Sequence, residues 1–214
     1  MYPKSIQKLI NLFTQFPTVG PRTAARFVFY LHKAPEKTIQ ELVEAILELK
    51  KGVAHCNFCF NPFQKSEEVE KSSKQTLLCP ICQNPKRNSQ ILCVVEKETD
   101  LEALEKTKKY NGLYFILGGT VGKLRKKDLE PLRIKELIAR IKKPSQYGIA
   151  SDGFKEIILA MNATTEGEAT ALYLQRQLSP LGIKISRLGR GLPAGGELEY
   201  ADEETIAGAL DNRK

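Results

Sequence analysis

Four of the five cysteines fall into two short motifs, CNFC at Cys56 to Cys59 and CPIC at Cys79 to Cys82. A Cys-x-x-Cys turn places two thiolates close enough to share one metal ion, and two such turns complete a tetrahedral all-sulfur site. Nineteen residues separate Cys59 from Cys79, a spacing typical of structural zinc sites. Because four protein ligands leave no position open for substrate or water, we predict one structural zinc ion per chain and no catalytic one.

Two other interpretations of these cysteines stay open. Disulfides would require an oxidising compartment, but the first residues, MYPKSIQKLI, are amphipathic and unlike an apolar secretion signal. We therefore expect a cytoplasmic chain with reduced thiols. His55 precedes Cys56 and offers an imidazole as an alternative ligand. The fifth cysteine, Cys93, lies in the apolar run ILCVV and is predicted to be a buried strand residue.

Acidic side chains follow two predicted strands. Glu96 comes directly after ILCVV, and the stretch MNATTEGE, which includes Glu166 and Glu168, follows closely on the apolar run EIILA. The carboxyl ends of parallel strands lie at one edge of a sheet, where α/β proteins place their sites. This arrangement resembles the Toprim domain shared by topoisomerases, primases and several nucleases. In that domain a glutamate after the first strand, an Asp-x-Asp pair and a Glu-Gly-Glu sequence together hold magnesium.

The resemblance is incomplete at the Asp-x-Asp pair. Asn162 and Thr164 stand in those two positions and offer neutral oxygens only, whereas magnesium prefers carboxylates or substrate phosphates. The segment LGGTVGKL also lacks the spacing of a phosphate-binding P-loop. We therefore predict a Toprim scaffold without catalytic activity. Its remaining carboxylates, Glu96, Glu166 and Glu168, are interpreted as an acidic patch for docking a partner protein.

The N-terminal segment is suited to phosphate contact. Residues 1–35 contain five Lys or Arg and no acid, within a chain of formal net charge +8. The run FPTVGPRTAARFVFYL resembles a helix-hairpin-helix, whose turn presents backbone N–H groups to a DNA phosphate. Gly20 is expected to permit the tight turn, and Arg22 and Arg26 lie one helical turn apart. Together with Val19, these residues are the predicted DNA contacts.

Alternatives to this interpretation of the basic residues stay open. Thr18 stands where such hairpins commonly hold a first glycine, and a simple packing turn is the alternative to a DNA-binding one. A second basic block, from Lys106 to Lys143, has twelve basic and three acidic residues. Its densest run, KLRKK, is equally consistent with a solvated lysine-rich surface.

The spacing of apolar residues predicts the elements that position these groups. Helices are predicted around 6–16, 23–31 and 38–50, the third with a buried apolar stripe; strands at 91–95, 113–117, 156–160 and 183–188; and covering helices at 100–108, 132–141 and 166–178. The alternation predicts a parallel sheet flanked by helices. The segment from Cys56 to Cys82 has few aliphatic residues, so we expect metal binding to fold it. The tail is predicted to be a Gly/Pro-rich loop followed by a short helix from near Asp202.

The predicted fold is therefore multidomain α/β, in four parts. They are a helical region with the helix-hairpin-helix at 1–53, a four-cysteine zinc finger at 54–85, a Toprim domain at 88–188 and a C-terminal tail at 189–214 that serves as an assembly surface. No stretch approaches the roughly 20 apolar residues of a membrane span, so no membrane association is expected.

In this order and at this length, these parts resemble the RecR family of bacterial recombination mediators. The tail RGLPAGGELEYADEETIAGAL adds to the resemblance. It implies a non-enzymatic protein of the cytoplasm and nucleoid that forms dimers and ring-like tetramers around DNA, either gapped or at a duplex/single-strand junction. It also implies action with RecO, and in many bacteria RecF, to load RecA onto single strands coated by single-strand-binding protein.

Two other functions compete with this one. A magnesium-dependent Toprim enzyme would cut or join strands with substrate phosphate supplying the missing ligands, and Asn162 and Thr164 argue against it. A zinc-stapled interaction module would have no DNA affinity of its own. Salt-sensitive DNA binding that depends on Arg22 and Arg26 would exclude that module.

Overall fold

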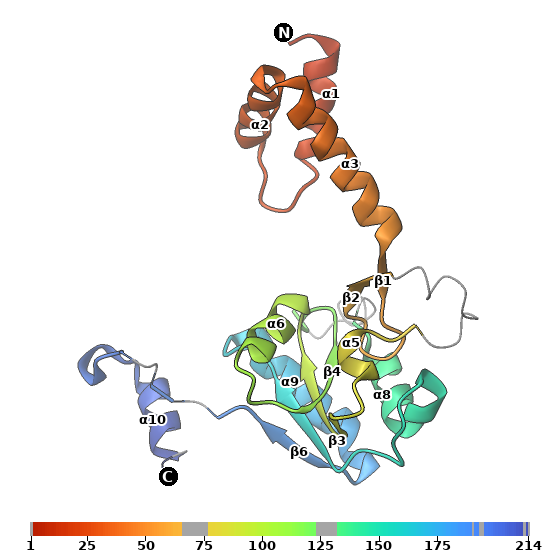
Figure 1. The fold of residues 1–214 in the computed structure, drawn as a ribbon. Helices are drawn as coiled ribbons and strands as arrows, with labels where there is room; N and C mark the ends of the chain where they lie inside the picture. The colour runs from red at the N-terminus through yellow and green to blue at the C-terminus, as the bar shows by residue number, and fades with distance from the viewer. Residues whose placement is uncertain are drawn as a thin grey trace. The chain divides into compact units, whose positions relative to one another are not determined.

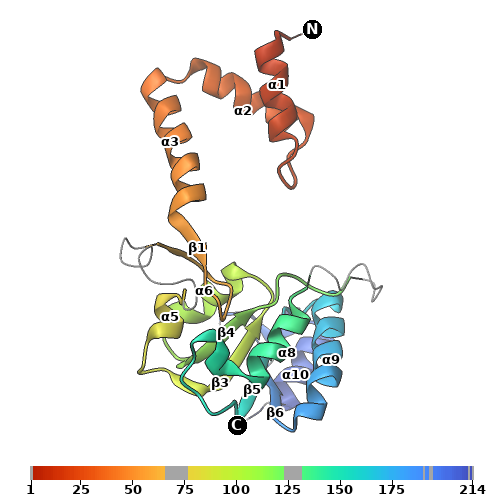
Figure 2. The same ribbon diagram turned by 90° about the vertical axis from the view of Figure 1, so that its right-hand side faces the viewer.

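The computed structural model describes residues 2–65, 77–122, 132–189, 191–192, 195–211 and 213, and Figures 1 and 2 show it from two directions. The predicted KLRKK loop and most of the charged insert between the cysteine motifs lie outside these ranges. The chain divides into two compact units, Met1–Val53 and Ala54–Lys214. Within the described ranges, no helix is long and apolar enough to cross a bilayer.

The first unit consists of three helices. They are α1 (Lys4–Phe13), α2 (Pro21–Lys33) and α3 (Glu36–Gly52). Pro21 occupies the first turn of α2, where its fixed φ suits a helix start and its missing N–H leaves no bond unmade. Ile10 of α1 is buried against Ala24 and Val28 of α2. This small core confirms the two predicted hairpin helices.

The prediction that α3 buries its apolar stripe is wrong. No residue of α3 is buried, and five of its large apolar side chains are at least 41% exposed: Leu42, Val43, Ile46, Leu47 and Leu49. The physical reason lies in the neighbours of the stripe. α1 and α2 bury their apolar faces against each other, and no described element of this unit covers α3.

The second unit contains a four-stranded parallel sheet, as predicted. Its strands are β3 (Asn88–Val95), β4 (Gly112–Ile116), β5 (Glu156–Ala160) and β6 (Lys184–Arg187), in the order β4-β3-β5-β6. Val95 is in register with Ile116 on one side and with Ala160 on the other. The residues that follow these three strands therefore meet at one edge of the sheet.

Helices cover both faces of this sheet (Figures 1 and 2). On one face, Leu137 of α8 (Ile134–Lys142) and Leu174 of α9 (Thr165–Leu178) pack against Val94 and Leu159. On the other face, α6 (Glu98–Lys106) buries Leu101 in a second core with Cys93 and Val95. Cys93 is thus the buried strand residue that was predicted.

From Ala54 onward, the cysteine-containing segment forms part of the second unit. It comprises the two-stranded sheet of β1 (Val53–His55) and β2 (Pro62–Gln64) and the short helix α5 (Pro80–Gln83). The remaining elements are the 3-10 turns η1 (Pro144–Tyr147), η2 (Ser179–Leu181) and η3 (Leu198–Tyr200) and the helix α10 (Glu203–Asp211). Asp202 accepts a 2.9 Å hydrogen bond from the Thr205 N–H, which confirms the predicted start of the tail helix.

Candidate metal centre and nucleic-acid interface

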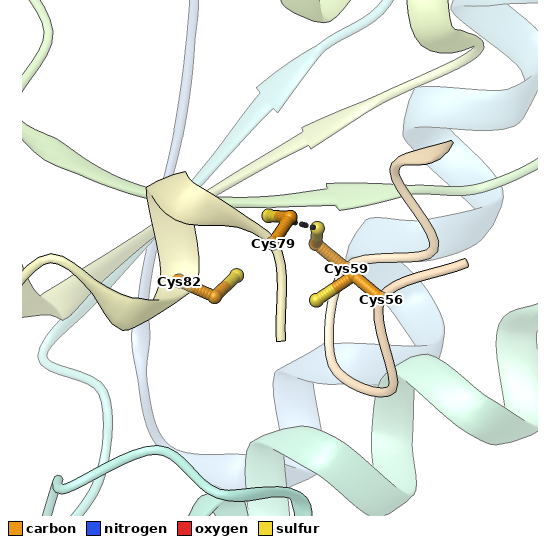
Figure 3. Close-up of side chains that lie close together, drawn as sticks. All are labelled: Cys56, Cys59, Cys79 and Cys82. Carbon is orange, nitrogen blue, oxygen red and sulfur yellow. Dashed lines mark hydrogen bonds between the residues drawn. The ribbon is translucent and has the colours of Figure 1, made fainter. Parts of the chain in front are cut away.

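The four cysteines of the two motifs converge on one point. All four are buried, and their Sγ atoms lie within 4.8 Å of one another. The Cys59 and Cys79 Sγ atoms are 3.6 Å apart (Figure 3). In a tetrahedral zinc site with Zn–S bonds of about 2.3 Å, the sulfurs are separated by about 3.8 Å. The four thiols therefore fit a tetrahedral metal ion with little rearrangement.

Local backbone structure brings the two motifs together. The turn that contains Cys56 is closed by a 3.0 Å hydrogen bond from the Phe60 N–H to its carbonyl. The second motif begins at Cys79, immediately before α5, and Cys82 lies within that helix. A 2.7 Å hydrogen bond from the Asn57 N–H to the Leu77 carbonyl links the two segments. The cluster is thus held by main-chain contacts as well as by its thiols.

The thiols interact strongly with one another. Hydrogen bonding with Cys59 holds the pKa of the Cys56 thiol well below its ordinary value, whereas hydrogen bonding with Cys56, aided by burial, raises the pKa of Cys82. By contrast, burial alone raises the pKa of the isolated Cys93 to about 12. A soft divalent cation relieves this competition for protons because all four sulfurs then bind it as thiolates.

The hairpin turn lies between α1 and α2, with its arginines on the surface. Thr18 adopts φ +64°, so the left-handed position of the turn is held by threonine. Gly20 has an ordinary φ of −84°, and nothing lies within 4 Å of the place a Cβ would take. The expected tight-turn role of Gly20 is therefore absent, and the glycine leaves open space at the start of α2. Arg22 and Arg26 are both exposed, and Val19 is half-buried.

The carboxyl edge of the sheet holds Glu96 by two hydrogen bonds. The Asn162 backbone N–H donates to Glu96 Oε1 at 2.7 Å, and Asn162 Nδ2 donates to Oε2 at 2.7 Å. Glu96 is only 6% exposed. The expected exposed patch therefore does not include the Glu96 carboxylate, because Asn162 covers it.

The other two glutamates lie in the first turn of α9. Glu166 is exposed, and Glu168 is paired with Arg187 at 3.0 Å. Thr164 is the N-cap of this helix, and its Oγ1 accepts a 3.1 Å hydrogen bond from the Gly167 N–H. A hollow of about 460 Å³ opens at this edge, lined in part by Glu168 and Arg187.

The sequence of this chain is similar to those of known protein families and of individual proteins. Residues 6–50 match the family description "RecR, helix-hairpin-helix", residues 90–189 match "Toprim domain", and residues 191–214 match "RecR, C-terminal". The chain is 44% identical over 209 residues to "Recombination protein RecR" of Chloroflexus aggregans, covering 98% of this chain and 93% of that protein. The proteins of the same name from Moorella thermoacetica (42%; 99% and 97% covered) and Desulfitobacterium hafniense (40%; 100% and 96% covered) are similar over 213 residues. The chain belongs to the RecR family.

Membership of the RecR family gives the chain a role in recombinational DNA repair and confirms the resemblance found in the sequence. The region that contains the parallel sheet matches the Toprim domain. The residues of its edge do not fit magnesium, since the Glu96 carboxylate already accepts two N–H donors. Asn162 and Thr164 supply no anionic oxygen to replace it.

Two arginines that the sequence did not single out contact the cysteine segment of this RecR-family chain: Arg140 of α8 and Arg133, which directly precedes that helix. The buried Arg140 donates to the Asn57 carbonyl from Nε and Nη2, at 3.0 and 2.8 Å. Its guanidinium lies 4.3 Å from the Phe60 ring centre, and that of Arg133 lies 4.5 Å from it. The one available signal was the position of Arg140 three residues after Leu137, on the apolar face of its helix.

Proposed function

We propose that this chain is a non-enzymatic recombination mediator that binds DNA, closes into a ring-like clamp and acts with RecO, and with RecF as a further candidate partner, to load RecA. It would work in the cytoplasm, at the nucleoid. We assign four parts to the chain. Residues 1–53 contact DNA, residues 54–85 form a zinc finger, residues 88–188 form the Toprim domain, and the tail at 189–214 serves assembly. The observation that carries this proposal is the exposed basic hairpin at the start of α2.

The hairpin is suited to a DNA phosphate in three ways. Helix α2 has no acidic residue in its first turn, so its N-terminal N–H groups present an uncompensated positive end. The open space beside Gly20 lets a phosphate approach the backbone, next to Val19. Arg22 and Arg26 are exposed one helical turn apart and can contact one phosphate track. Such contacts bind DNA without reading its sequence.

Exposed apolar side chains support assembly into dimers and tetramers. The α3 stripe consists of five exposed large apolar residues, Leu42, Val43, Ile46, Leu47 and Leu49. An exposed apolar patch of this kind is typical of an interaction surface. The tail adds a second group: Leu192, Leu198, Tyr200 and Leu210. Two separate surfaces of this kind per chain are what a closed ring requires. A ring multiplies weak phosphate contacts by placing several hairpins around one duplex.

Charging the α3 stripe should break one of these interfaces. In a Val43→Lys/Ile46→Lys variant, burying two ammonium groups costs more than the apolar contact returns, so we expect the assembly mass from light scattering to fall by about half or more. Glu48→Lys, which makes the same change of two charges on the opposite, exposed side of α3, is the control and should leave the mass unchanged. An unaltered mass in the double variant would exclude the stripe as an assembly surface.

The four cysteines are proposed to hold one structural zinc ion per chain. The ligand set favours zinc over other metals because a tetrahedron of four thiolates is the characteristic structural site of zinc. When bound, the ion supplies folding energy to the segment and no chemistry. Cys56, Cys59, Cys79 and Cys82 would be its ligands.

The non-enzymatic assignment can be tested together with DNA and RecO binding. We expect zinc-loaded protein to shift gapped DNA in a gel at low salt, more weakly at physiological salt, and to leave the strands intact with magnesium or manganese. RecO should strengthen or redirect the shift. Cleavage that disappears in a Glu96→Gln variant would show that the Toprim edge holds a working metal after all.

The same assay addresses RecO docking. We propose that Glu166 and Glu168, in the first turn of α9, form the acidic contact for RecO in an otherwise basic protein, whereas Glu96 is buried. In a Glu166→Gln/Glu168→Gln variant, the RecO-dependent change of the shift should be lost while DNA binding alone is kept. Unchanged RecO dependence would remove this patch from the proposal.

A further inference from the structure

We propose that the Asn162 side chain takes the structural place of a metal ion in this Toprim domain, acting as an amide latch on Glu96. In a metal-binding edge, a cation draws the carboxylates of neighbouring strands together. Here the same junction is closed by two N–H donors of Asn162, each 2.7 Å from a different Glu96 oxygen. This inference is independent of DNA binding and of RecO.

The chemistry of the contact requires an amide at position 162. Glu96 is 6% exposed, and a buried carboxylate must be matched by donors to avoid a large desolvation cost. Asn162 satisfies both oxygens at the short distance of charge-assisted hydrogen bonds. Aspartate in the same place would bring a second carboxylate within hydrogen-bonding distance of the first, so a cation would be needed to hold them.

The packing around the latch is close on the side of α9. Gly167, in the first turn of α9, lies so close that a Cβ there would come within 2.1 Å of the Asn162 carbonyl oxygen and 3.2 Å of Glu96 Oε1. Magnesium usually keeps several water ligands, which need room at this point. Thr164 carries less of the argument, because aspartate is an equally good N-cap and would also accept from the Gly167 N–H.

The latch joins several elements that follow different strands. Glu96 follows β3, Asn162 follows β5, and the Gly118 N–H, just after β4, donates to the Glu96 carbonyl at 2.9 Å. Arg187 of β6 pairs with Glu168 of α9 at the same edge. The Asn162 amide therefore holds together the edge of the sheet beside which the exposed residues of α9 lie. This contact does not depend on the cellular magnesium concentration.

The first test is the Asn162→Asp variant of the full chain, loaded with zinc and melted without magnesium. We expect its Tm to fall by roughly 6–12 °C, as for other broken buried charge contacts. Millimolar magnesium chloride should recover much of this loss, while shifting the parent protein by less than about 1 °C. The matched control is Asn88→Asp, in which the new carboxylate still accepts the 2.9 Å hydrogen bond from the Gln90 N–H, so the Tm should not change.

A second variant keeps the test decisive if the first fails to fold. In Glu96→Gln/Asn162→Asp, the introduced glutamine accepts from the backbone N–H and donates its amide to the introduced aspartate. Donor and acceptor are exchanged and the net charge is kept, so the Tm should return to near the parent value without magnesium. The latch is refuted if Asn162→Asp alone melts like the parent, if magnesium stabilises the parent equally, or if the double variant is no more stable than the single one.

Discussion

A Cys59→Ala variant should lose its zinc and with it the folded cysteine segment. Cys59 is fully buried, and its Sγ belongs to the four-sulfur cluster. Structural zinc sites contribute apparent binding free energies of about 10–16 kcal/mol, most of which is folding free energy in a segment that has few apolar residues. We expect metal analysis to show a fall from one zinc ion per chain to almost none, and the Tm to fall by at least about 10 °C.

The loss should reach the parallel sheet, because the cluster is attached to its edge strand. The Ile116 N–H donates to the Cys59 carbonyl at 3.0 Å, and the Phe60 ring meets Phe115 edge-on. Amide hydrogen exchange in β4 should therefore quicken along with exchange in the cysteine segment. Cys93→Ala, which removes a buried thiol outside the cluster, is the control and should keep its zinc. Full zinc content in Cys59→Ala would refute the ligand assignment.

The sequence predicted most of the fold because its signals are local. Two Cys-x-x-Cys motifs identify a metal cluster by spacing alone, and the four short apolar runs became β3, β4, β5 and β6 with bounds shifted by a few residues. The prediction that the α3 stripe is buried was wrong because apolar periodicity shows which face of a helix is to be covered, and does not show which element covers it. In this structure the cover does not come from the described elements of its own unit.

The hydrogen bonds between residues far apart in the sequence could not be predicted from the sequence. Asn162 and Glu96 are 66 positions apart, and only the parallel register of β3 and β5 brings the amide to the carboxylate. From sequence, Asn162 indicated only a missing ligand, whereas the structure gives it a bond of its own. Arg140 and the Asn57 carbonyl are 83 positions apart. In the hairpin, the roles of Thr18 and Gly20 depend on backbone torsions that the sequence does not specify.

An Arg22→Ala/Arg26→Ala variant should lose most of its DNA affinity. Each Lys or Arg that contacts a phosphate releases counterions, so removing two contacts per chain should lower the slope of log K against log salt by about 2 for every bound hairpin. We expect affinity for gapped DNA at low salt to fall roughly 10- to 100-fold, and more if several hairpins of a ring bind together. Fluorescence anisotropy over a salt series measures both quantities.

The charge pattern of the two units supplies the control for this experiment. Lys155→Ala/Arg176→Ala removes the same charge from exposed positions of the second unit, so it should change the affinity little if contact is local to the hairpin. Arg22→Lys/Arg26→Lys should keep the salt slope, because the slope counts charges, and lose only the affinity that depends on guanidinium geometry. Equal losses in both alanine variants would mean that DNA responds to the net charge of +8. The hairpin would then be a packing turn without a local role in DNA contact.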